Sequence, residues 1–457
     1  MPIFSRPIVT RSRIRNRLLL LSTFLSLTLL FYLNNRGPAL PTTTSDAAVT
    51  TSSASNFPPP PPLAVHHLLF SIASSSSSLP RRTPYIRLWY DPISAHNNTF
   101  LFLDRPTTEP ANPSSIPPIV LSSKSSPNLP SGYRIALIVK DAVTLDIPNI
   151  QWYVFGDDDT IFFTENLVRI LSKYDHNRWY YIGYGSESFE QNDKFFFGMA
   201  FGGGGFAISA PLARVLARVL DACLGRYPHL YGSDARIFAC LSELGVGLTP
   251  EPGFHQVDVR GNLFGFLAAH PLSPLLSLHH MEAVEPIFPG MNRIQSLEHL
   301  FEAVQVDPAK VLQQTVCYDH TNSLTISIAW GYVVQVYDGN KLLLDILSLQ
   351  KSFRPWRRGK NVDSSRYMFN TREFPRDPCK RPAVFFMDTV VSDTNQVWTS
   401  YTKRDDDSCV RLKATEKLKV IRVLSPKLDF DIEQLKTLRR HCCDISPSFS
   451  EKIGSPN

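Results

Sequence analysis

The chain has 457 residues and a formal net charge of only +6, from 47 basic and 41 acidic residues. Five arginines lie within the first 17 residues, so the charge balance does not favour a nucleic-acid-binding surface. The chain is too long for one compact core, and we expect two folded parts with appended segments. All seven cysteines follow residue 220, and their odd number leaves at least one thiol unpaired if the others form bridges within the chain.

The N-terminal segment is predicted to anchor the protein in a membrane. Residues 1–17 form a basic tail, and Leu18–Leu33 is a run of sixteen uncharged, mostly apolar residues. As a helix with a rise of about 1.5 Å per residue, the run would span roughly 24 Å, which suits a thin early-secretory bilayer. Because the basic tail precedes the run, the N-terminus is expected in the cytosol and the remainder in the lumen. A cleaved signal peptide is the alternative.

Residues 34–62 are rich in Pro, Ser and Thr and end in FPPPPP. Such a segment buries too little apolar surface to fold, and it is predicted to be a stem that holds the following part away from the membrane. Asn97 begins a sequon for N-glycosylation, which is meaningful only if this region is lumenal.

Strand-like and helix-like segments alternate between residues 63 and 183, interrupted by a Pro- and Ser-rich stretch over 105–130 that is expected to be a loop. This alternation predicts an open α/β sheet that binds its ligand at the strand ends. We expect strands at His66–Ala73, Thr99–Leu103 and Trp179–Gly183, and helices at Arg82–Tyr90, Ser131–Thr144 and Glu165–Tyr174.

Three consecutive aspartates, Asp157, Asp158 and Asp159, lie between the apolar, β-prone runs Trp152–Phe155 and Thr160–Thr164. Carboxylates in this position are costly to desolvate unless a cation accompanies them, and hard divalent cations prefer carboxylate oxygens. In an extended segment Asp157 and Asp159 point to one side and Asp158 to the other. Two carboxylates can therefore face one metal ion, which can in turn face a diphosphate. For this motif alone, a solvated acidic turn or a helix N-cap is the alternative.

Three further features follow this acidic motif. The run Gly202–Gly205 permits positive φ angles and close approach of the backbone to a ligand, although a tight turn explains it equally well. Asp234 precedes a helix expected over Ala235–Leu244, either as its N-cap or as a general base at the mouth of a cleft. His255 follows a loop bounded by Pro and Gly, as a hydrogen-bonded loop residue or a metal ligand.

Together these stretches resemble the Fringe-like glycosyltransferases of glycosyltransferase family 31, in particular the plant Fringe-related branch described as a domain of unknown function. The resemblance covers roughly residues 63–445 and lies in the combination and order of the motifs rather than in any one of them. The matching segments are WYVFGDDDTIFF, NRWYYIG, FGGGGFAIS, PHLYGSDARIFACLSELGV, GFHQVDVRGNLFGFLAAHPLSPLLSLHH, YMFNTR and the late HCC.

The resemblance implies a GT-A fold over residues 63–290, which is an α/β domain with a mostly parallel central sheet that binds a nucleotide sugar, followed by a mixed α/β extension over 291–457. It implies an ion of Mn²⁺ or Mg²⁺ held by Asp157, Asp159 and His255. The residues implied to contact the donor, a UDP-sugar, are Asp104, Asp157, Asp158, Gly202, Gly203, Gly204 and Gly205.

The activity implied is an inverting, β-1,3-type transfer of a hexose or N-acetylhexosamine to a hydroxyl of a glycan or glycoprotein. The implied location is the Golgi membrane, with a single-pass type II anchor and the catalytic part in the lumen. Association with itself or with other glycosyltransferases is a further expectation, and nucleic acid is not expected as a partner.

One departure from the family concerns the base. In Fringe-like enzymes an acidic pair lies at the start of the helix expected here over Ala235–Leu244, and the second acidic residue of the pair is the usual candidate for the general base. In this chain the pair reads Asp234-Ala235. Either Asp234 takes the role, or another group does, or this copy is catalytically weak. The alternatives are therefore a non-catalytic protein that binds nucleotide sugar or assists a sister enzyme, and a metal-dependent hydrolase.

The region over 291–457 contains amphipathic and strand-like runs and five of the cysteines. One or two disulfides are expected there in an oxidising lumen, with a pairing that the sequence does not reveal. A second acidic triplet, Asp405–Asp407, follows basic residues and no apolar strand, and it is predicted to be a solvated loop.

Overall fold

The computed structural model describes residues 62–93, 98–106, 116–122, 134–357, 365–394, 396–404, 409, 413–429 and 431–446. The predicted cytosolic tail, anchor and stem up to residue 61 lie outside this part, as do Asn97 and Asp405–Asp407. No helix within the described ranges is long and apolar enough to cross a membrane. The chain divides into the units Met1–Pro60 and Pro61–Asn457, and the second is described here.

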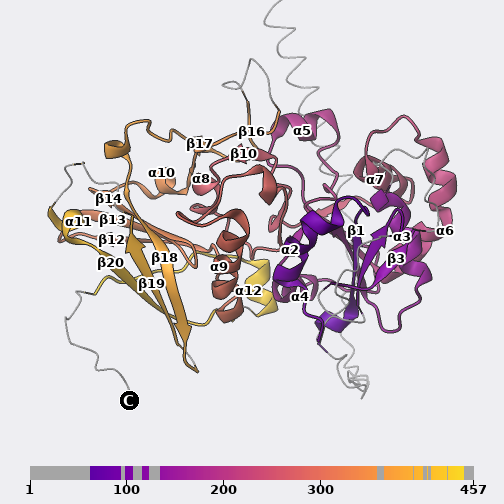
Figure 1. Ribbon diagram of the computed structural model, residues 1–457, viewed down its shortest axis with the longest axis horizontal. Helices are drawn as coiled ribbons and strands as arrows, with labels where there is room; N and C mark the ends of the chain where they lie inside the picture. Colours follow the sequence, from indigo (N-terminus) through magenta and orange to yellow (C-terminus); the bar gives the residue numbers. More distant parts are fainter. Residues whose placement is uncertain are drawn as a thin grey trace, which may run out of the picture. The chain divides into compact units, whose positions relative to one another are not determined.

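A seven-stranded sheet with the order β3-β2-β1-β4-β7-β6-β8 forms one part of this unit (Figure 1). Strands β3, β2, β1 and β4 run parallel, β7 is antiparallel to both of its neighbours, and β6 is parallel to β8. The prediction of an α/β protein with a mostly parallel central sheet is thereby confirmed. The strands are β1 (Leu68–Ala73), β2 (Thr99–Leu103), β3 (Ile119–Leu121), β4 (Trp152–Asp157), β6 (Tyr181–Gly183), β7 (Phe206–Ser209) and β8 (Leu248–Pro250).

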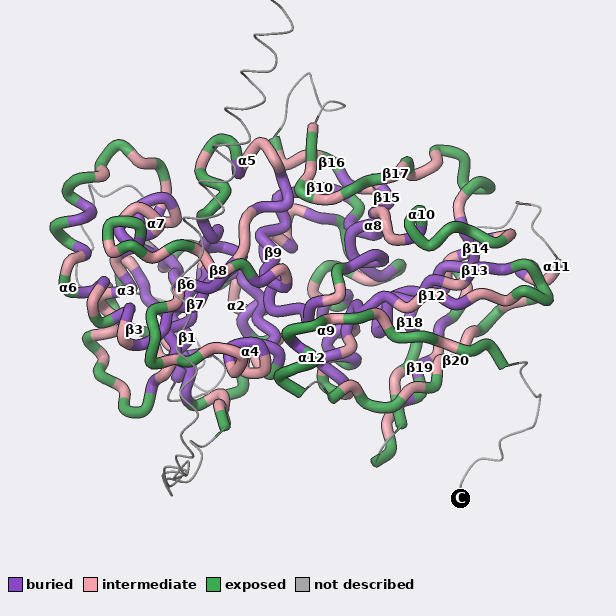
Figure 2. Tube along the Cα trace, turned by 180° about the vertical axis from the view of Figure 1, so that it is seen from behind, coloured by how far each residue is buried: buried purple, intermediate pink, exposed green. Residues whose placement is uncertain are grey.

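Both faces of this sheet are apolar, as expected for a largely parallel sheet covered on two sides. Along β4, Trp152 and Val154 belong to one buried cluster, whereas Tyr153 and Phe155 belong to another that includes residues of α3, α6 and α7. Figure 2 shows the central strands as mainly buried. The first helices are η1 (Val65–His67), α2 (Leu79–Trp89), α3 (Arg134–Thr144), α4 (Thr164–Leu171), α5 (Phe189–Lys194), α6 (Ala210–Arg226) and α7 (Ser233–Glu243).

Several elements differ from the sequence prediction in their limits: β1, β6 and α7 differ by two residues or fewer, and α4 ends at Leu171 rather than Tyr174. Helix α2 begins at Leu79 rather than Arg82, because Pro80 lies in its first turn, where the missing N–H costs no hydrogen bond. Strand β3 lies inside the predicted 105–130 loop, and it is only three residues long and pairs with β2 alone.

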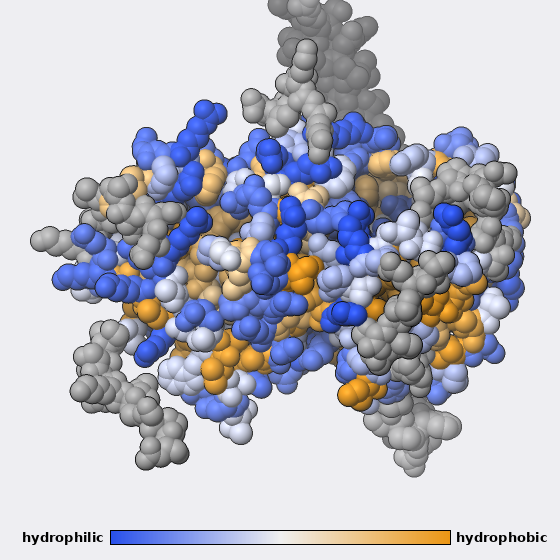
Figure 3. All heavy atoms as spheres, viewed as in Figure 1, coloured by the Kyte–Doolittle hydropathy of each residue, from blue (hydrophilic) through white to orange (hydrophobic). Residues whose placement is uncertain are grey.

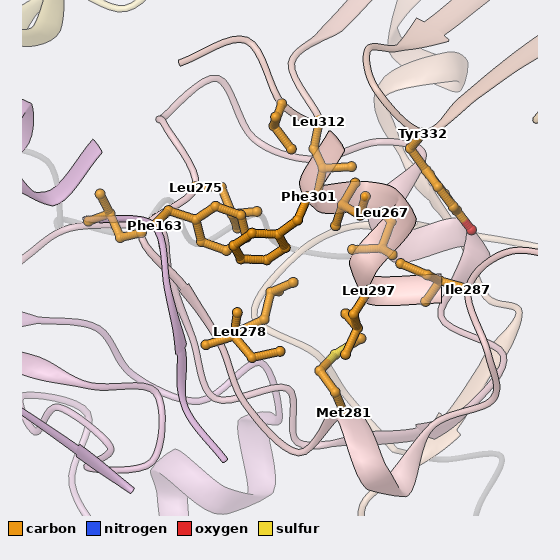
Figure 4. Packing of buried hydrophobic residues seen from close by; sticks show 14 of the residues in the cluster. Phe163, Leu267, Leu275, Leu278, Met281, Ile287, Leu297, Phe301, Leu312 and Tyr332 are labelled. Carbon is orange, nitrogen blue, oxygen red and sulfur yellow. The ribbon is translucent and has the colours of Figure 1, made fainter. Parts of the chain in front are cut away.

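The segment 254–288 packs against the face of the seven-stranded sheet to which Trp152 and Val154 belong. Strand β11 (Ser277–Leu278) lies between β5 (Ile161–Phe162) and β9 (Phe254–His255), antiparallel to the former and parallel to the latter. Figure 4 shows Leu278 and Met281 in one apolar cluster with Leu297 and Phe301 of α9 (Arg293–Val306). This packing therefore holds the backbone in place on either side of the two residues between Leu278 and Met281. The same segment contains β10 (Val259–Gly261), α8 (Phe264–Leu267) and η3 (Met281–Ala283).

A six-stranded antiparallel sheet, β12-β13-β14-β18-β19-β20, follows α9. Tyr332, in the turn between β13 and β14, belongs to the same cluster as Phe163, so this core contains residues from both sides of position 290 (Figure 4). On the face in Figure 3, hydrophobic residues form small patches among hydrophilic ones. The elements are β12 (Gln314–Asp319), β13 (Leu324–Ala329), β14 (Val333–Asp338), α10 (Leu343–Leu347), β15 (Leu349–Gln350), β16 (Phe353–Pro355), β17 (Thr371–Arg372), η5 (Pro378–Lys380), β18 (Ala383–Ser392), β19 (Gln396–Lys403), α11 (Lys413–Lys417), β20 (Val420–Pro426) and α12 (Ile432–Lys436).

Six of the cysteines form three disulfides. Two of these lie in the C-terminal region as expected, Cys317–Cys443 and Cys379–Cys409, and the third, Cys223–Cys240, joins α6 to α7. Cys442 is the free thiol that the odd number requires, and it is exposed.

Candidate metal centre

Asp157, Asp159 and His279 form a cluster that can hold a metal ion. Their ligand atoms all lie within 4.8 Å of one another. Nε2 of His279 is 3.2 Å from Oδ1 of Asp159 and 3.8 Å from Oδ2 of Asp157. Asp159 and His279 are buried, whereas 37% of the Asp157 side chain is exposed, so the cluster is open to solvent on the side of Asp157. The structure therefore brings the two predicted aspartate ligands together.

His255, the predicted third ligand, is not part of this cluster. Its Nδ1 is 3.1 Å from Oε1 of Glu187, and its Nε2 is 2.8 Å from Nε2 of His270. The reason is strand register. His255 is paired with Leu278 across β9 and β11, so its side chain lies on the same side of this small sheet as that core residue. His279 comes one residue later, beyond the end of β11, and it takes the position that the sequence analysis gave to His255.

Asp158 and Asp104 both contact the loop that follows β1. Asp158 points away from the metal cluster, as the alternation predicts, and Oδ2 accepts hydrogen bonds from the hydroxyls of Ser74 at 2.8 Å and Ser78 at 2.5 Å. Oδ1 of Asp104 accepts a hydrogen bond from the N–H of Ser76 at 2.9 Å. Two of the three predicted donor-binding carboxylates thus fix this loop at the start of α2.

Arg82 is a cation of this site that the sequence analysis did not identify. Its side chain is only 12% exposed, and its guanidinium contacts the carboxylate of Asp159 and lies 2.8 Å from that of Glu282. Strand order explains this contact: β1 and β4 are parallel neighbours, so the segments after them meet at one edge of the sheet. The basic start of the helix after β1 is therefore expected beside the acidic motif after β4.

The charges of the cluster alter the pKa values of its members. Burial alone would raise the pKa of Asp159 and lower that of His279, but their mutual attraction reverses both effects. With Asp157 nearby, the pKa of His279 rises to about 9, while His279 and Arg82 hold the pKa of Asp159 well below its usual range. Desolvation within the cluster, together with the neighbouring carboxylates, raises the pKa of Asp157 to about 7. A metal ion that binds through His279 must therefore displace a proton.

The first two residues of the glycine run contact the two functional side chains directly. A Cβ atom on Gly202 would lie 2.6 Å from Oδ1 of Asp234, and one on Gly203 would lie 2.2 Å from Cε1 of His279. Only glycine fits at both positions, so this turn brings Asp234 and the metal cluster close to one another.

The other two glycines are held by bonds within the protein. The N–H of Gly204 donates to Oε1 of Gln256 at 2.6 Å, and Gly205, at φ +85°, donates its N–H to the carbonyl of Gly202 at 3.0 Å. Thr160 joins this turn to the acidic one, because its hydroxyl donates to the carbonyl of Gly203 at 2.7 Å and accepts from the N–H of Asp157 at 2.8 Å. The N–H groups of Gly204 and Gly205 therefore have hydrogen-bond acceptors within the protein and need no bound ligand to satisfy them.

Asp234 lies in the first turn of α7, whose N-cap is Gly232, so the prediction of Asp234 as N-cap is wrong. Burial raises the pKa of Asp234 to about 6, which suits a general base near neutral pH. The next residue, Ala235, is 2% exposed and packs with Met199 and Phe201. A carboxylate at position 235 would therefore point into an apolar cluster, and Asp234 is the acidic residue of this pair that faces the glycine turn.

A segment from beyond α9 also reaches the edge of the site. Strand β16 pairs with β10, and the ring of Trp356, just after β16, stacks on that of His280 with centroids 4.1 Å apart and an angle of 11°. His280 adopts the left-handed conformation, with φ 53°, and its Nδ1 lies 3.4 Å from Oδ1 of Asp258. The guanidinium of Arg260 lies 3.9 Å from the centre of the Trp356 ring. The C-terminal region thus helps to fix the residue that follows His279.

Comparison with known proteins gives a family but no activity. No curated protein matches the chain. A family model described as "Protein of unknown function, DUF604" matches residues 191–443, which is more than half of the chain. The matched region contains the glycine run, Asp234 and His279, and it begins after the acidic turn. The chain therefore belongs to the DUF604 family.

Proposed function

We propose that this protein is a metal-dependent inverting glycosyltransferase that moves a sugar from a UDP-sugar to a hydroxyl of a glycan or glycoprotein. The observation that carries the proposal is the contact of Gly202 with Asp234 and of the adjacent Gly203 with His279. A metal site and a carboxylate base at neighbouring positions are the two groups that sugar transfer from a diphosphate needs. The resemblance to Fringe-like enzymes, with their GT-A fold, points to the same reaction.

The ligand set suits the expected cations. Two carboxylates and one imidazole provide hard oxygen donors and a nitrogen donor, which favours Mn²⁺ and leaves Mg²⁺ as the alternative. The ion would supply charge neutralisation for the leaving diphosphate. Arg82, already in contact with Asp159, adds a second positive charge on the same side of the acidic turn.

Asp234 is the proposed base. Its carboxylate accepts the proton of the acceptor hydroxyl while that oxygen forms a bond to the anomeric carbon of the donor sugar. The bond between this carbon and the diphosphate oxygen breaks on the opposite face, UDP leaves with the electron pair, and the configuration inverts. The transition state has the oxocarbenium character known from glycoside hydrolysis. A pKa of about 6 keeps Asp234 largely ionised at neutral pH.

The non-catalytic alternative rests on Ala235. That residue packs in an apolar cluster with Met199 and Phe201, where a carboxylate would be costly to desolvate, and this favours Asp234 as the base. For the location we propose the Golgi lumen, with Leu18–Leu33 as a type II anchor, and three disulfides suit such an oxidising compartment. Three further points stay predictions: a hexose or N-acetylhexosamine as the transferred sugar, a β-1,3 linkage, and association with other transferases.

The proposal is tested by expressing residues 62–457 as a secreted protein and measuring Mn²⁺ binding, UDP binding and UDP release from a panel of UDP-sugars, with and without EDTA. We expect Asp159→Ala and His279→Ala to lose Mn²⁺ binding and turnover. Asp234→Asn is expected to bind Mn²⁺ and UDP and to turn over 10²- to 10⁴-fold more slowly. Asp388→Asn, at an exposed position on β18, is the control and should match the wild type.

Two results would contradict the assignment. Wild-type Mn²⁺ affinity in both Asp159→Ala and His279→Ala would show that the metal site is elsewhere. Metal-dependent UDP binding in a wild-type protein that transfers no sugar to any acceptor tested would instead favour the non-catalytic alternative.

A further inference from the structure

Five partly or largely exposed aromatic side chains lie on α5, in the segment directly after it and in the segment before α7, and we call this set the aromatic ledge. Three of them are exposed, Phe196 by 39%, Phe197 by 51% and Tyr231 by 78%. Water-exposed aromatic rings in a group mark binding surfaces more often than single exposed residues do. The ledge consists of Phe189, Phe195, Phe196, Phe197 and Tyr231.

The rings of the ledge are fixed by contacts with one another and with the core. Phe195 and Tyr231 stack with centroids 6.3 Å apart and an angle of 25°, and Phe195 meets the buried Phe201 edge-on at 6.0 Å. Phe196 packs on Phe238 of α7 at 5.0 Å. The remaining pair, Phe189 and Phe197, has centroids 5.5 Å apart. The exposed faces therefore have defined directions before any ligand binds, which reduces the entropy cost of binding.

The ledge lies next to the proposed base. Phe201, against which Phe195 packs, directly precedes Gly202, and Gly202 contacts Asp234. Tyr231 is three residues before Asp234, so at about 3.5 Å per residue their Cα atoms are at most about 10 Å apart. A ligand that rests on the ledge can therefore present a hydroxyl to Asp234.

Charged groups interrupt and border this apolar surface. Nζ of Lys194 lies 4.8 Å from the centre of the Phe195 ring and 5.6 Å from that of Tyr231. The guanidinium of Arg366 lies 4.1 Å from the centre of the Phe189 ring. Small apolar areas with polar groups at their edges suit an amphipathic small ligand better than the broad apolar face of a protein partner.

We propose that the aromatic ledge is an acceptor subsite that binds a pyranose ring of a glycan. A pyranose presents C–H groups on its faces and hydroxyls around its rim. Faces of the bound glycan's sugar rings would stack on the exposed rings of Phe197 and Tyr231, while Arg366, beside the pair of rings that includes Phe197, and Lys194, beside the pair that includes Tyr231, would donate hydrogen bonds to the sugar hydroxyls. This inference rests on the proposed function for the role of the site, although binding by the ledge can be tested without any transfer reaction.

The test is glycan binding in the presence of Mn²⁺ and UDP. A glycan array first identifies pyranose oligosaccharides that bind residues 62–457, and the affinity of the bound glycans is then measured by isothermal titration as methyl glycosides, which carry no aromatic group of their own. We expect Phe197→Ala and Tyr231→Ala each to weaken binding about three- to tenfold, as loss of a ring contact predicts. Tyr231→Phe keeps the ring and should bind like the wild type.

The control is Trp398→Ala, which removes an exposed aromatic ring from β19, 46% exposed, away from the ledge. Unchanged melting temperature, Mn²⁺ affinity and UDP affinity in the ledge variants would show that the loss is local. Absence of any bound glycan, or wild-type glycan affinity in both alanine variants, would overturn the proposal for the ledge. A wild-type protein that binds neither Mn²⁺ nor UDP, but binds a glycan through Tyr231, would support the ledge as a glycan-binding site. The same result would contradict the proposed transferase activity.

Discussion

At the scale of single residues, His255 belongs to a buried chain of hydrogen bonds rather than to the metal centre. His270 donates from Nδ1 to the carbonyl of Pro271 at 2.7 Å, so a neutral His270 accepts at Nε2 from the Nε2–H of His255. Nδ1 of His255 is then an acceptor and requires a proton on Glu187. Burial supports this arrangement, because it raises the pKa of Glu187 to about 7 and lowers that of His255 to about 3.

These shifts predict a loss of stability in acid. Burial also holds the pKa of His270 well below 6.5, so between about pH 4.5 and 6.5 the unfolded chain binds two protons on the histidines, and the folded chain holds one on Glu187. The unfolded state binds more protons, and the free energy of unfolding falls as the pH decreases through this window, by up to about 1.4 kcal/mol per pH unit. Denaturant titrations between pH 4.5 and 7.5 measure this slope.

Replacing one histidine isolates the effect from other titrating groups. His270→Gln is expected to lower stability at pH 7.5 and to flatten the slope, because one proton-binding group of the unfolded state is gone. His229→Gln, at an exposed position, serves as the control. Equal slopes in His270→Gln and the wild type would show that this chain of hydrogen bonds does not determine the acid sensitivity.

The sequence revealed some residues of the site and not others. The acidic triplet was recognisable because carboxylates between two apolar strands need a cation. The choice between His255 and His279 was not recognisable. His255 ends β9 and His279 comes just after β11, and only the pairing of His255 with Leu278 decides which side chain faces the metal cluster. The contact of Arg82 with Asp159 likewise depends on which strand ends are neighbours in the sheet.

At the scale of elements, two turns build the site, and the glycine turn is the more restrictive. Gly203→Ala would push a methyl group into the imidazole of His279, which must then move away from Asp159. We expect Mn²⁺ affinity to fall about 10- to 100-fold, as for loss of a group that orients a metal ligand. Isothermal titration with Mn²⁺ measures this change, and circular dichroism checks that the fold is retained.

Gly225→Ala is the matched control for this prediction. Gly225 lies in the last turn of α6, and a Cβ atom there would meet nothing within 4 Å. Alanine should leave Mn²⁺ affinity unchanged and add about 0.5–1 kcal/mol of helix stability. If Gly203→Ala binds Mn²⁺ as well as Gly225→Ala does, the turn does not position His279.

Most of the longer helices and strands could be predicted from the sequence, because apolar runs and prolines mark where they begin and end. Strand β2 agrees with its apolar run at both ends, and α6 has Pro211 in its first turn, where the missing N–H costs no hydrogen bond. The short strands were harder: β3 has only three residues, and it exists because β2 offers an unpaired edge rather than through a pattern of its own.

At the scale of the whole unit 61–457, the C-terminal region contacts the part of the chain before residue 290 instead of folding apart. Strand β16 pairs with β10, and residues 366–368 form backbone hydrogen bonds with Glu187 and Phe189 next to the ledge. Contacts between residues so distant in the chain have no local sequence signal, because an apolar run does not show which edge it will pair with. For this reason the sequence predicted the fold class but not the contribution of Trp356 to the site.

The Cys317–Cys443 disulfide closes the C-terminal region on itself, since it joins β12 to a residue near the end of the described chain across a sequence separation of 126 residues. In the chain-entropy account, closure of such a loop stabilises the folded state by roughly 5 kcal/mol, against roughly 3 kcal/mol for Cys223–Cys240 with its separation of 17. We expect Cys317→Ala with Cys443→Ala to lower the free energy of unfolding more than Cys223→Ala with Cys240→Ala, as measured by denaturant titration at pH 7.5. Cys442→Ser removes the exposed free thiol and should be neutral. A smaller loss for the 317–443 pair would mean that packing of the C-terminal sheet, rather than the covalent link, holds this region in place.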